Sequence, residues 1–78
     1  MKRTWGGADY STALRSDNDE GWVALELARR RGEHAERVAR VVFWDAEGQF
    51  FLETFAHDVP LPIVEDMIAE SKTAMKVR

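Results

Sequence analysis

The sequence of 78 residues contains no cysteine and only two prolines, and residues 41–70 include neither lysine nor arginine. Without cysteine, disulfides and thiolate chemistry are excluded, and no Cys/His cluster is present to hold a structural zinc. The longest apolar run, residues 41–44, is far too short to cross a bilayer. The basic amino terminus has no apolar run behind it, so no secretory signal is expected. We therefore expect a soluble, cytoplasmic, single-domain protein without metal, cofactor or membrane partner.

Charge is distributed very unevenly along the chain. The net charge is −3, but residues 41–70 carry seven acidic side chains and no basic one. Residues 29–40 carry the opposite excess, with five arginines against two glutamates. Such asymmetry is typical of a surface that recognises a charged partner.

Three runs of β-branched and aromatic residues predict antiparallel strands at about 22–30, 35–44 and 49–56. The turn between the last two runs, residues 45–48, ends in Gly48, which is expected to take the left-handed conformation. Residues 1–20 are partly irregular. Within them residues 10–14 are read as a short edge strand, with one helical turn after Asp9 as the alternative.

Opposed residues of the first two strands are expected to sum to 66, because this register matches apolar with apolar and acid with base. On one face it pairs Val23 with Phe43, Leu25 with Val41, and Leu27 with Ala39. On the other face it pairs Trp22 with Trp44, Glu26 with Arg40, and Arg30 with Glu36.

A helix is predicted at about 61–75, after the proline-containing segment 58–62. Its apolar stripe comprises Val64, Met67, Ile68, Ser71 and Met75. The sequence therefore predicts an α+β fold, a three- to four-stranded antiparallel β-meander packed on one C-terminal helix. One helix cannot cover both apolar faces of such a sheet, so we expect a homodimer or a bound partner, with the interface at Trp22, Trp44 and Val42.

No arrangement of residues in the sequence predicts catalysis. The two histidines, His34 and His57, lack the spacing of metal ligands, and no nucleophile elbow, phosphate loop or dinucleotide fingerprint is present. The segment Asp17–Asp19 resembles the start of a calcium loop, but Ala28 stands where the bidentate glutamate is required. We expect a non-enzymatic protein without catalytic or metal-binding residues.

The basic turn suggests one alternative function. Residues 41–70, a strand, an Asp-x-x-Gly turn, a strand and a helix, resemble in outline the small sheet-based DNA-binding domains of plant transcription factors and phage integrases. That resemblance implies contact with nucleic acid through Arg29, Arg30, Arg31 and Arg37. Those domains carry lysine and arginine on the third strand and the helix, where this chain is uniformly acidic, so direct binding to nucleic acid is not the favoured interpretation.

The favoured interpretation is a protein-interaction module with an acidic binding surface. Its small size, acidity and lack of motifs resemble the anti-CRISPR and DNA-mimic inhibitors of phages and mobile elements, which implies an inhibitor or adaptor that binds a larger, possibly nucleic-acid-binding, protein assembly. The predicted partner-binding residues are Asp45, Glu47, Glu65, Asp66 and Glu70. A generic subunit of an unknown enzyme remains a third possibility.

Overall fold

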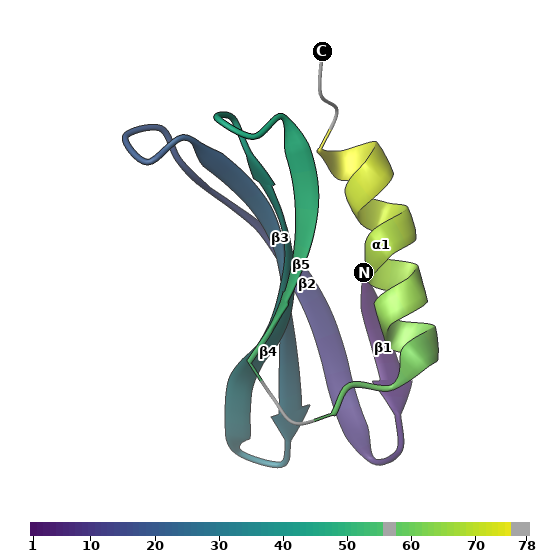
Figure 1. Ribbon diagram of the computed structural model, residues 1–78. Coiled ribbons are helices and arrows are strands. Elements are labelled where there is room, and N and C mark those ends of the chain that lie inside the picture. The colour runs from purple at the N-terminus through teal and green to yellow at the C-terminus, as the bar shows by residue number, and fades with distance from the viewer. Residues whose placement is uncertain (56–57, 76–78) are drawn as a thin grey trace.

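The computed structural model describes residues 1–55 and 58–75. Five antiparallel strands form one sheet in the order in which they occur along the chain, and one helix packs on a face of it (Figure 1). The elements are β1 (Lys2–Trp5), β2 (Ala8–Asp17), β3 (Trp22–Arg31), β4 (His34–Trp44), β5 (Gln49–Thr54) and α1 (Leu61–Ala74). The predicted α+β meander with a C-terminal helix is confirmed, although the number of strands was underestimated.

The amino-terminal segment accounts for the difference in strand number. Gly6 and Gly7 both have positive φ, 57° and 78°, and form the tight turn of a hairpin between β1 and β2. This hairpin was not predicted, because residues 1–20 were expected to be partly irregular. The edge strand expected at residues 10–14 is the middle of β2, which spans 10 residues and pairs with β3 along its length.

The register predicted between β3 and β4 is confirmed over the half of the hairpin nearest Trp22. The observed pairs there are Trp22 with Trp44, Val23 with Phe43, Leu25 with Val41, Glu26 with Arg40, and Leu27 with Ala39. Apolar matching on one face and opposite charges on the other therefore identify the register, as expected for side chains that lie directly opposite one another.

A bulge changes the register in the other half of this hairpin. Val38 is an extra residue on β4, and both Val38 and Ala39 are fully buried. The bulge allows two successive apolar side chains to enter the core. As a consequence Arg29, not Arg30, lies opposite Glu36, and the predicted pairing of Arg30 with Glu36 is wrong.

Strand β5 completes the meander through a turn that ends at Gly48, which has a φ of 65°. The left-handed glycine predicted there is confirmed. Phe50 pairs with Phe43, and the two rings lie 5.0 Å apart. The strand ends at Thr54, earlier than the predicted residue 56, and position 56 lies outside the described residues.

Helix α1 begins and ends close to the predicted bounds, but its buried stripe differs. Met67, Ser71 and Met75 are buried as expected, and so is Ile63, which was not predicted. Ile68 was assigned to the stripe but is exposed. Ile63, Met67 and Ser71 are spaced by four residues, so the helix contacts the sheet along an i, i+4 row. In the part of the chain that the structure describes, no helix has both the length and the apolar character needed to cross a membrane.

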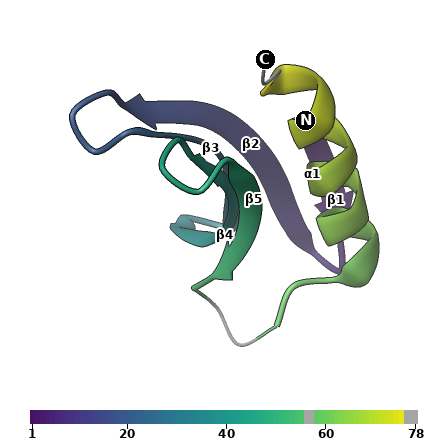
Figure 2. The same ribbon diagram turned by 45° about the horizontal axis from the view of Figure 1, so that its top comes forward.

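The main core lies between α1 and the face of the sheet on which it packs. Its largest members are Tyr10, Leu25, Leu27, Val38, Ile63 and Met67, all fully or almost fully buried. The helix contacts β2, β3 and β4, and Figure 2 shows it lying over β1 and away from β5. The helix therefore leaves β5 and the whole opposite face of the sheet uncovered.

Candidate functional site

The face of the sheet opposite α1 is partly covered by its own long side chains. Glu26 is only 9% exposed, and its carboxylate accepts a hydrogen bond from Nη1 of Arg37 at 3.1 Å. Nε of Arg15 lies 3.6 Å from the other carboxylate oxygen of Glu26. The aliphatic parts of long charged side chains can shield apolar surface while their charged ends stay in water.

The same face is covered further along β4 by Arg40. Its guanidinium donates a hydrogen bond to Glu53 and lies over the ring of Trp22, 5.0 Å from the ring centroid. Val42, on the same face of β4, is fully buried. The sheet face that was expected to need a second protein is therefore shielded in part by this layer of arginine and carboxylate groups.

The predicted dimer interface on this face stays a prediction. Trp22 and Trp44 lie edge to face with ring centroids 6.4 Å apart, and both side chains are half-buried. Val42 cannot contribute contact area without movement of the side chains above it, because it is already fully buried.

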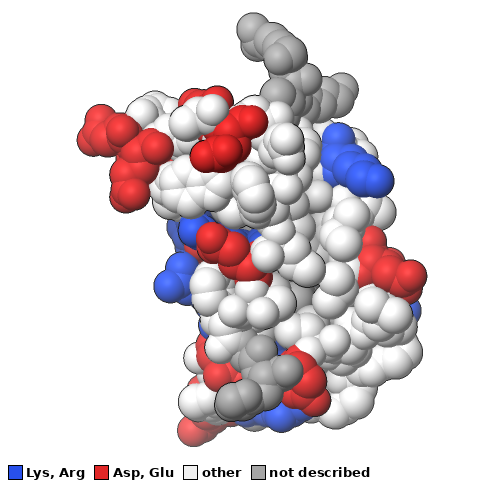
Figure 3. All heavy atoms as spheres, viewed as in Figure 1, with Lys and Arg blue, Asp and Glu red and all other residues white. Residues whose placement is uncertain are grey.

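Two turns bring acidic side chains together at one end of the sheet. The β2–β3 and β4–β5 turns are neighbours, since the backbone amide of Asp45 donates a hydrogen bond to the carbonyl of Gly21 at 2.9 Å. The two turns contain four acidic residues and no basic one, and Asp17 at the end of β2 adds a fifth. These residues, here called the acidic end, are Asp17, Asp19, Glu20, Asp45 and Glu47. Figure 3 shows acidic groups gathered at this end of the molecule, above the strands. Four of these side chains are exposed, while Asp17 is half-buried and accepts a hydrogen bond from the amide of Glu20.

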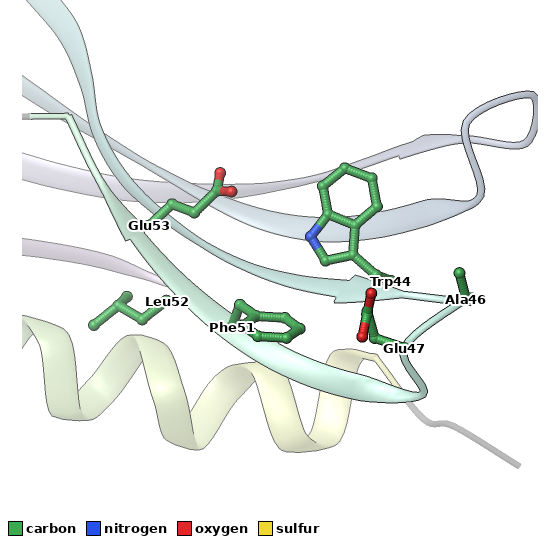
Figure 4. Close-up of a pocket in the computed structure, with 6 residues that line it drawn as sticks. All are labelled: Trp44, Ala46, Glu47, Phe51, Leu52 and Glu53. Atoms are coloured by element: carbon green, nitrogen blue, oxygen red, sulfur yellow. The ribbon is translucent and has the colours of Figure 1, made fainter.

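An apolar hollow of about 520 Å³ adjoins the acidic end. Trp44 and Phe51 line it from adjacent strands, and Ala46 and Glu47 contribute from the turn (Figure 4). Leu52 and Glu53 complete the lining. Aromatic surface beside a charged rim is the usual composition of a protein-binding site.

The acidic residues of the helix lie in a different setting from those of the acidic end. Asp66 forms an ion pair with Arg3 of β1, and Glu70 accepts a hydrogen bond from Thr12 at 2.8 Å. The amino group of Met1 also lies 3.2 Å from Glu70. These two carboxylates therefore connect α1 to the amino-terminal hairpin, and of the predicted helix residues Glu65 is the most exposed.

The predicted basic cluster is largely occupied by contacts within the chain. Arg29 is 9% exposed and donates hydrogen bonds to Glu36 at 2.8 Å and to the carbonyl of Asp58 at 3.2 Å. Arg30 donates to the carbonyl of Gly32 at 2.9 Å. Arg37 binds Glu26 as described above, and Arg31 is exposed. These contacts thus stabilise the β3–β4 hairpin and, through Arg29, join it to the segment before α1.

The hydrogen bond from Arg29 lowers the pKa of Glu36 below its ordinary value of 4.5 and raises the pKa of Arg29. A carboxylate with a lowered pKa in the folded state stabilises the fold above its unfolded pKa and loses this contribution as the pH falls through the folded pKa. We expect Glu36→Gln to lower the urea midpoint at pH 7, with a difference from the unmodified protein that shrinks toward pH 3. A difference that stays constant over this range would contradict the assigned ion pair.

No group of three or more histidine, aspartate or glutamate side chains positioned to hold a metal ion occurs among residues 1–55 and 58–75. Comparison with protein-family models, with curated proteins and with solved structures finds no match to this chain. Function is therefore inferred from the fold and the surface.

Three residues of the acidic end, Asp17, Asp19 and Glu20, were not predicted as binding residues. The sequence contained a signal that identifies them. Because Trp22 was predicted to pair with Trp44, the residues that precede Trp22 and the residues that follow Trp44 must lie in neighbouring turns. The predicted set instead combined Asp45 with acids of the helix, because all of them lie within residues 41–70.

Proposed function

We propose that this protein is a non-enzymatic interaction module, an inhibitor or adaptor whose acidic end binds a basic surface on a larger protein assembly. The observation that carries the proposal is the meeting of five carboxylates at the acidic end, beside an apolar hollow lined by Trp44 and Phe51. Exposed carboxylates steer the encounter with a basic partner, and a half-buried aromatic group supplies the contact that slows dissociation.

The chemistry of the acidic end favours a partner that ordinarily binds nucleic acid. A basic groove that accepts phosphates presents lysine and arginine side chains at close spacing, and these attract a dense group of carboxylates equally well. The protein is on this basis an acidic competitor of nucleic acid. The alternative, direct binding of nucleic acid through the β3–β4 turn, is less favoured because Arg29 and Arg37 already bind carboxylates of the same chain.

The proposal is tested by reversing three charges of the acidic end, Asp19→Lys, Glu20→Lys and Asp45→Lys. A matched control reverses three exposed acids elsewhere, Glu33→Lys, Asp58→Lys and Glu65→Lys, so that both variants have the same net charge. Immobilised variants are exposed to a lysate of the source cell, and the proteins retained at low and at physiological salt are compared.

We expect the unmodified protein and the control to retain the same basic protein, and the acidic-end variant to retain much less of it. Added salt and added duplex DNA should both release it, because both compete for the same basic groups. Equal retention by all three proteins would contradict the proposed site. Retention lost only in the control variant would contradict the proposed site and assign binding to Glu33, Asp58 or Glu65 instead.

A further inference from the structure

The two edges of the sheet differ in how they are protected. Strand β1 has 4 residues, two of them basic, and Arg3 is tied to the helix by Asp66. Beyond β1 the same edge is formed by residues 13–17 of β2, which include the charged residues Arg15 and Asp17. Short, charged edge strands resist pairing with another sheet. Strand β5 lies at the other edge and carries the consecutive apolar residues Phe50, Phe51 and Leu52, which are 43%, 42% and 47% exposed. These three residues, here called the β5 edge, have none of the usual protection.

The backbone of β5 offers free hydrogen-bonding groups at this edge. The amide of Phe55 donates to the carbonyl of Val38 in β4 at 2.7 Å. Since the peptide groups of alternate residues point to opposite sides of a strand, Phe51 and Glu53 also face β4, whereas Phe50, Leu52 and Thr54 face outward. The outer edge therefore presents main-chain amide and carbonyl groups that can pair with a further antiparallel strand.

An apolar groove runs beside the same edge. It has a volume of about 220 Å³ and lies between β5 and α1, lined by Phe50, Leu52 and the exposed side of Ile68, among others. Figure 3 shows an uncharged surface between the end of β5 and the helix. A strand added to β5 would place alternate side chains in this groove, as in other complexes formed by strand addition.

We propose that the β5 edge binds β5 of a second copy of this chain, in an antiparallel pair with Phe51 of both copies on the twofold axis. In this register Phe50 lies opposite Leu52 of the second copy and exchanges main-chain hydrogen bonds with it. Gln49 lies opposite Glu53 of the second copy. The pairs are thus aromatic with aromatic, apolar with apolar and amide with carboxylate, which are favourable cross-strand combinations.

The neighbouring register is less favourable. Centring the twofold axis on Leu52 would place Phe51 opposite Glu53 and bring an apolar ring against a carboxylate. In the proposed register each of Phe50, Phe51 and Leu52 meets an apolar side chain of the same segment, so β5 is complementary to itself, which supports a second copy as the occupant. The resulting dimer has one continuous sheet of ten strands, twice the five of each copy.

The dimer goes beyond the proposed function, although Phe51 also lines the hollow beside the acidic end. Dimerisation depends on the β5 edge, whereas the partner-binding test above alters Asp19, Glu20 and Asp45, none of which lies on β5. The two proposals can therefore fail separately.

The absence of native cysteine makes disulfide cross-linking a direct test of the register. Directly opposed residues of a non-hydrogen-bonded antiparallel pair have Cα atoms about 4.5 Å apart, within the range of about 4.4–6.8 Å that a disulfide requires. We expect Phe51→Cys to form a covalent dimer on mild oxidation. The reaction should be at least about ten-fold faster than for Leu14→Cys, an exposed control on β2, because pairing raises the effective thiol concentration.

Two further variants check the register independently of position 51. Gln49→Cys and Glu53→Cys should cross-link efficiently when mixed and poorly when oxidised alone.

Sedimentation of the full chain at high micromolar concentration tests the dimer without cross-linking. Phe51→Lys should be monomeric, because it places two ammonium groups opposite each other, while Leu14→Lys should remain dimeric.

A protein that sediments only as a monomer would overturn the proposal. So would a dimer that persists in Phe51→Lys with no selective cross-linking at position 51, since that dimer would use another surface, such as the sheet face of Trp22 and Trp44.

Discussion

Replacing Leu27 with alanine is expected to lower the free energy of unfolding by about 2–5 kcal/mol. Leu27 is fully buried in the cluster between the sheet and α1, and it adjoins the bulge that carries Val38 and Ala39 into the core. Leu27 is paired with Thr12 of β2 on one side and with Ala39 of β4 on the other, so the cavity left by the substitution cannot close by a simple shift of the strand. A domain of 78 residues has a small core, and a loss of this size is a large part of its total stability.

Urea denaturation followed by circular dichroism measures this effect. Leu14→Ala is the matched control, because Leu14 lies on the neighbouring strand but is 52% exposed. We expect the control to change the urea midpoint little. Comparable effects at the two positions would contradict the location of the core, and a loss of less than about 1 kcal/mol at Leu27 would show that the site relaxes into the space.

Replacing Arg40 with alanine is expected to destabilise the protein by about 1–3 kcal/mol, mostly through lost cover rather than lost charge. Arg40 lies over the ring of Trp22 and binds Glu53 on the sheet face that has no helix. Without it, Trp22 loses the side chain that lies over its ring and shields it from water. The ion pair itself contributes less, because Glu53 is partly exposed and its charge is screened by solvent.

Arg40→Met separates these two contributions, because methionine keeps an unbranched apolar chain and removes the charge. We expect Arg40→Met to recover more than half of the loss, measured by thermal denaturation, and to keep the total tryptophan emission close to that of the unmodified protein. Equal destabilisation by alanine and methionine would mean that the charge interactions dominate on this face.

The parts of the fold that could be predicted are those in which neighbouring residues along the chain decide the structure. The pairing of β3 with β4 near Trp22 follows from matched apolar and charged residues, and the turn at Gly48 follows from its glycine. The bulge at Val38 could not be predicted in the same way, because its cause is burial against a helix that comes later in the chain. Its consequence, the pairing of Arg29 with Glu36, was missed for the same reason.

The candidate site could be predicted only in part. The acidity of residues 41–70 was evident, but distance in sequence does not show that Asp45 lies beside Gly21 of another turn. The ion pairs of Asp66 and Glu70 depend on the amino-terminal hairpin, whose first strand was not anticipated. The exposure of the β5 edge likewise depends on where α1 lies, which an apolar stripe alone does not determine.

Photo-crosslinking tests most directly whether the acidic end is the partner-binding surface. A photoreactive phenylalanine analogue is placed at Ala46, which lies in the acidic turn and lines the hollow, or at Ala69, which is exposed on the polar side of α1. After illumination in the source cell, we predict one discrete adduct with a basic protein from position 46 and none from position 69. An adduct formed only from position 69, or from neither position, would contradict the proposed function.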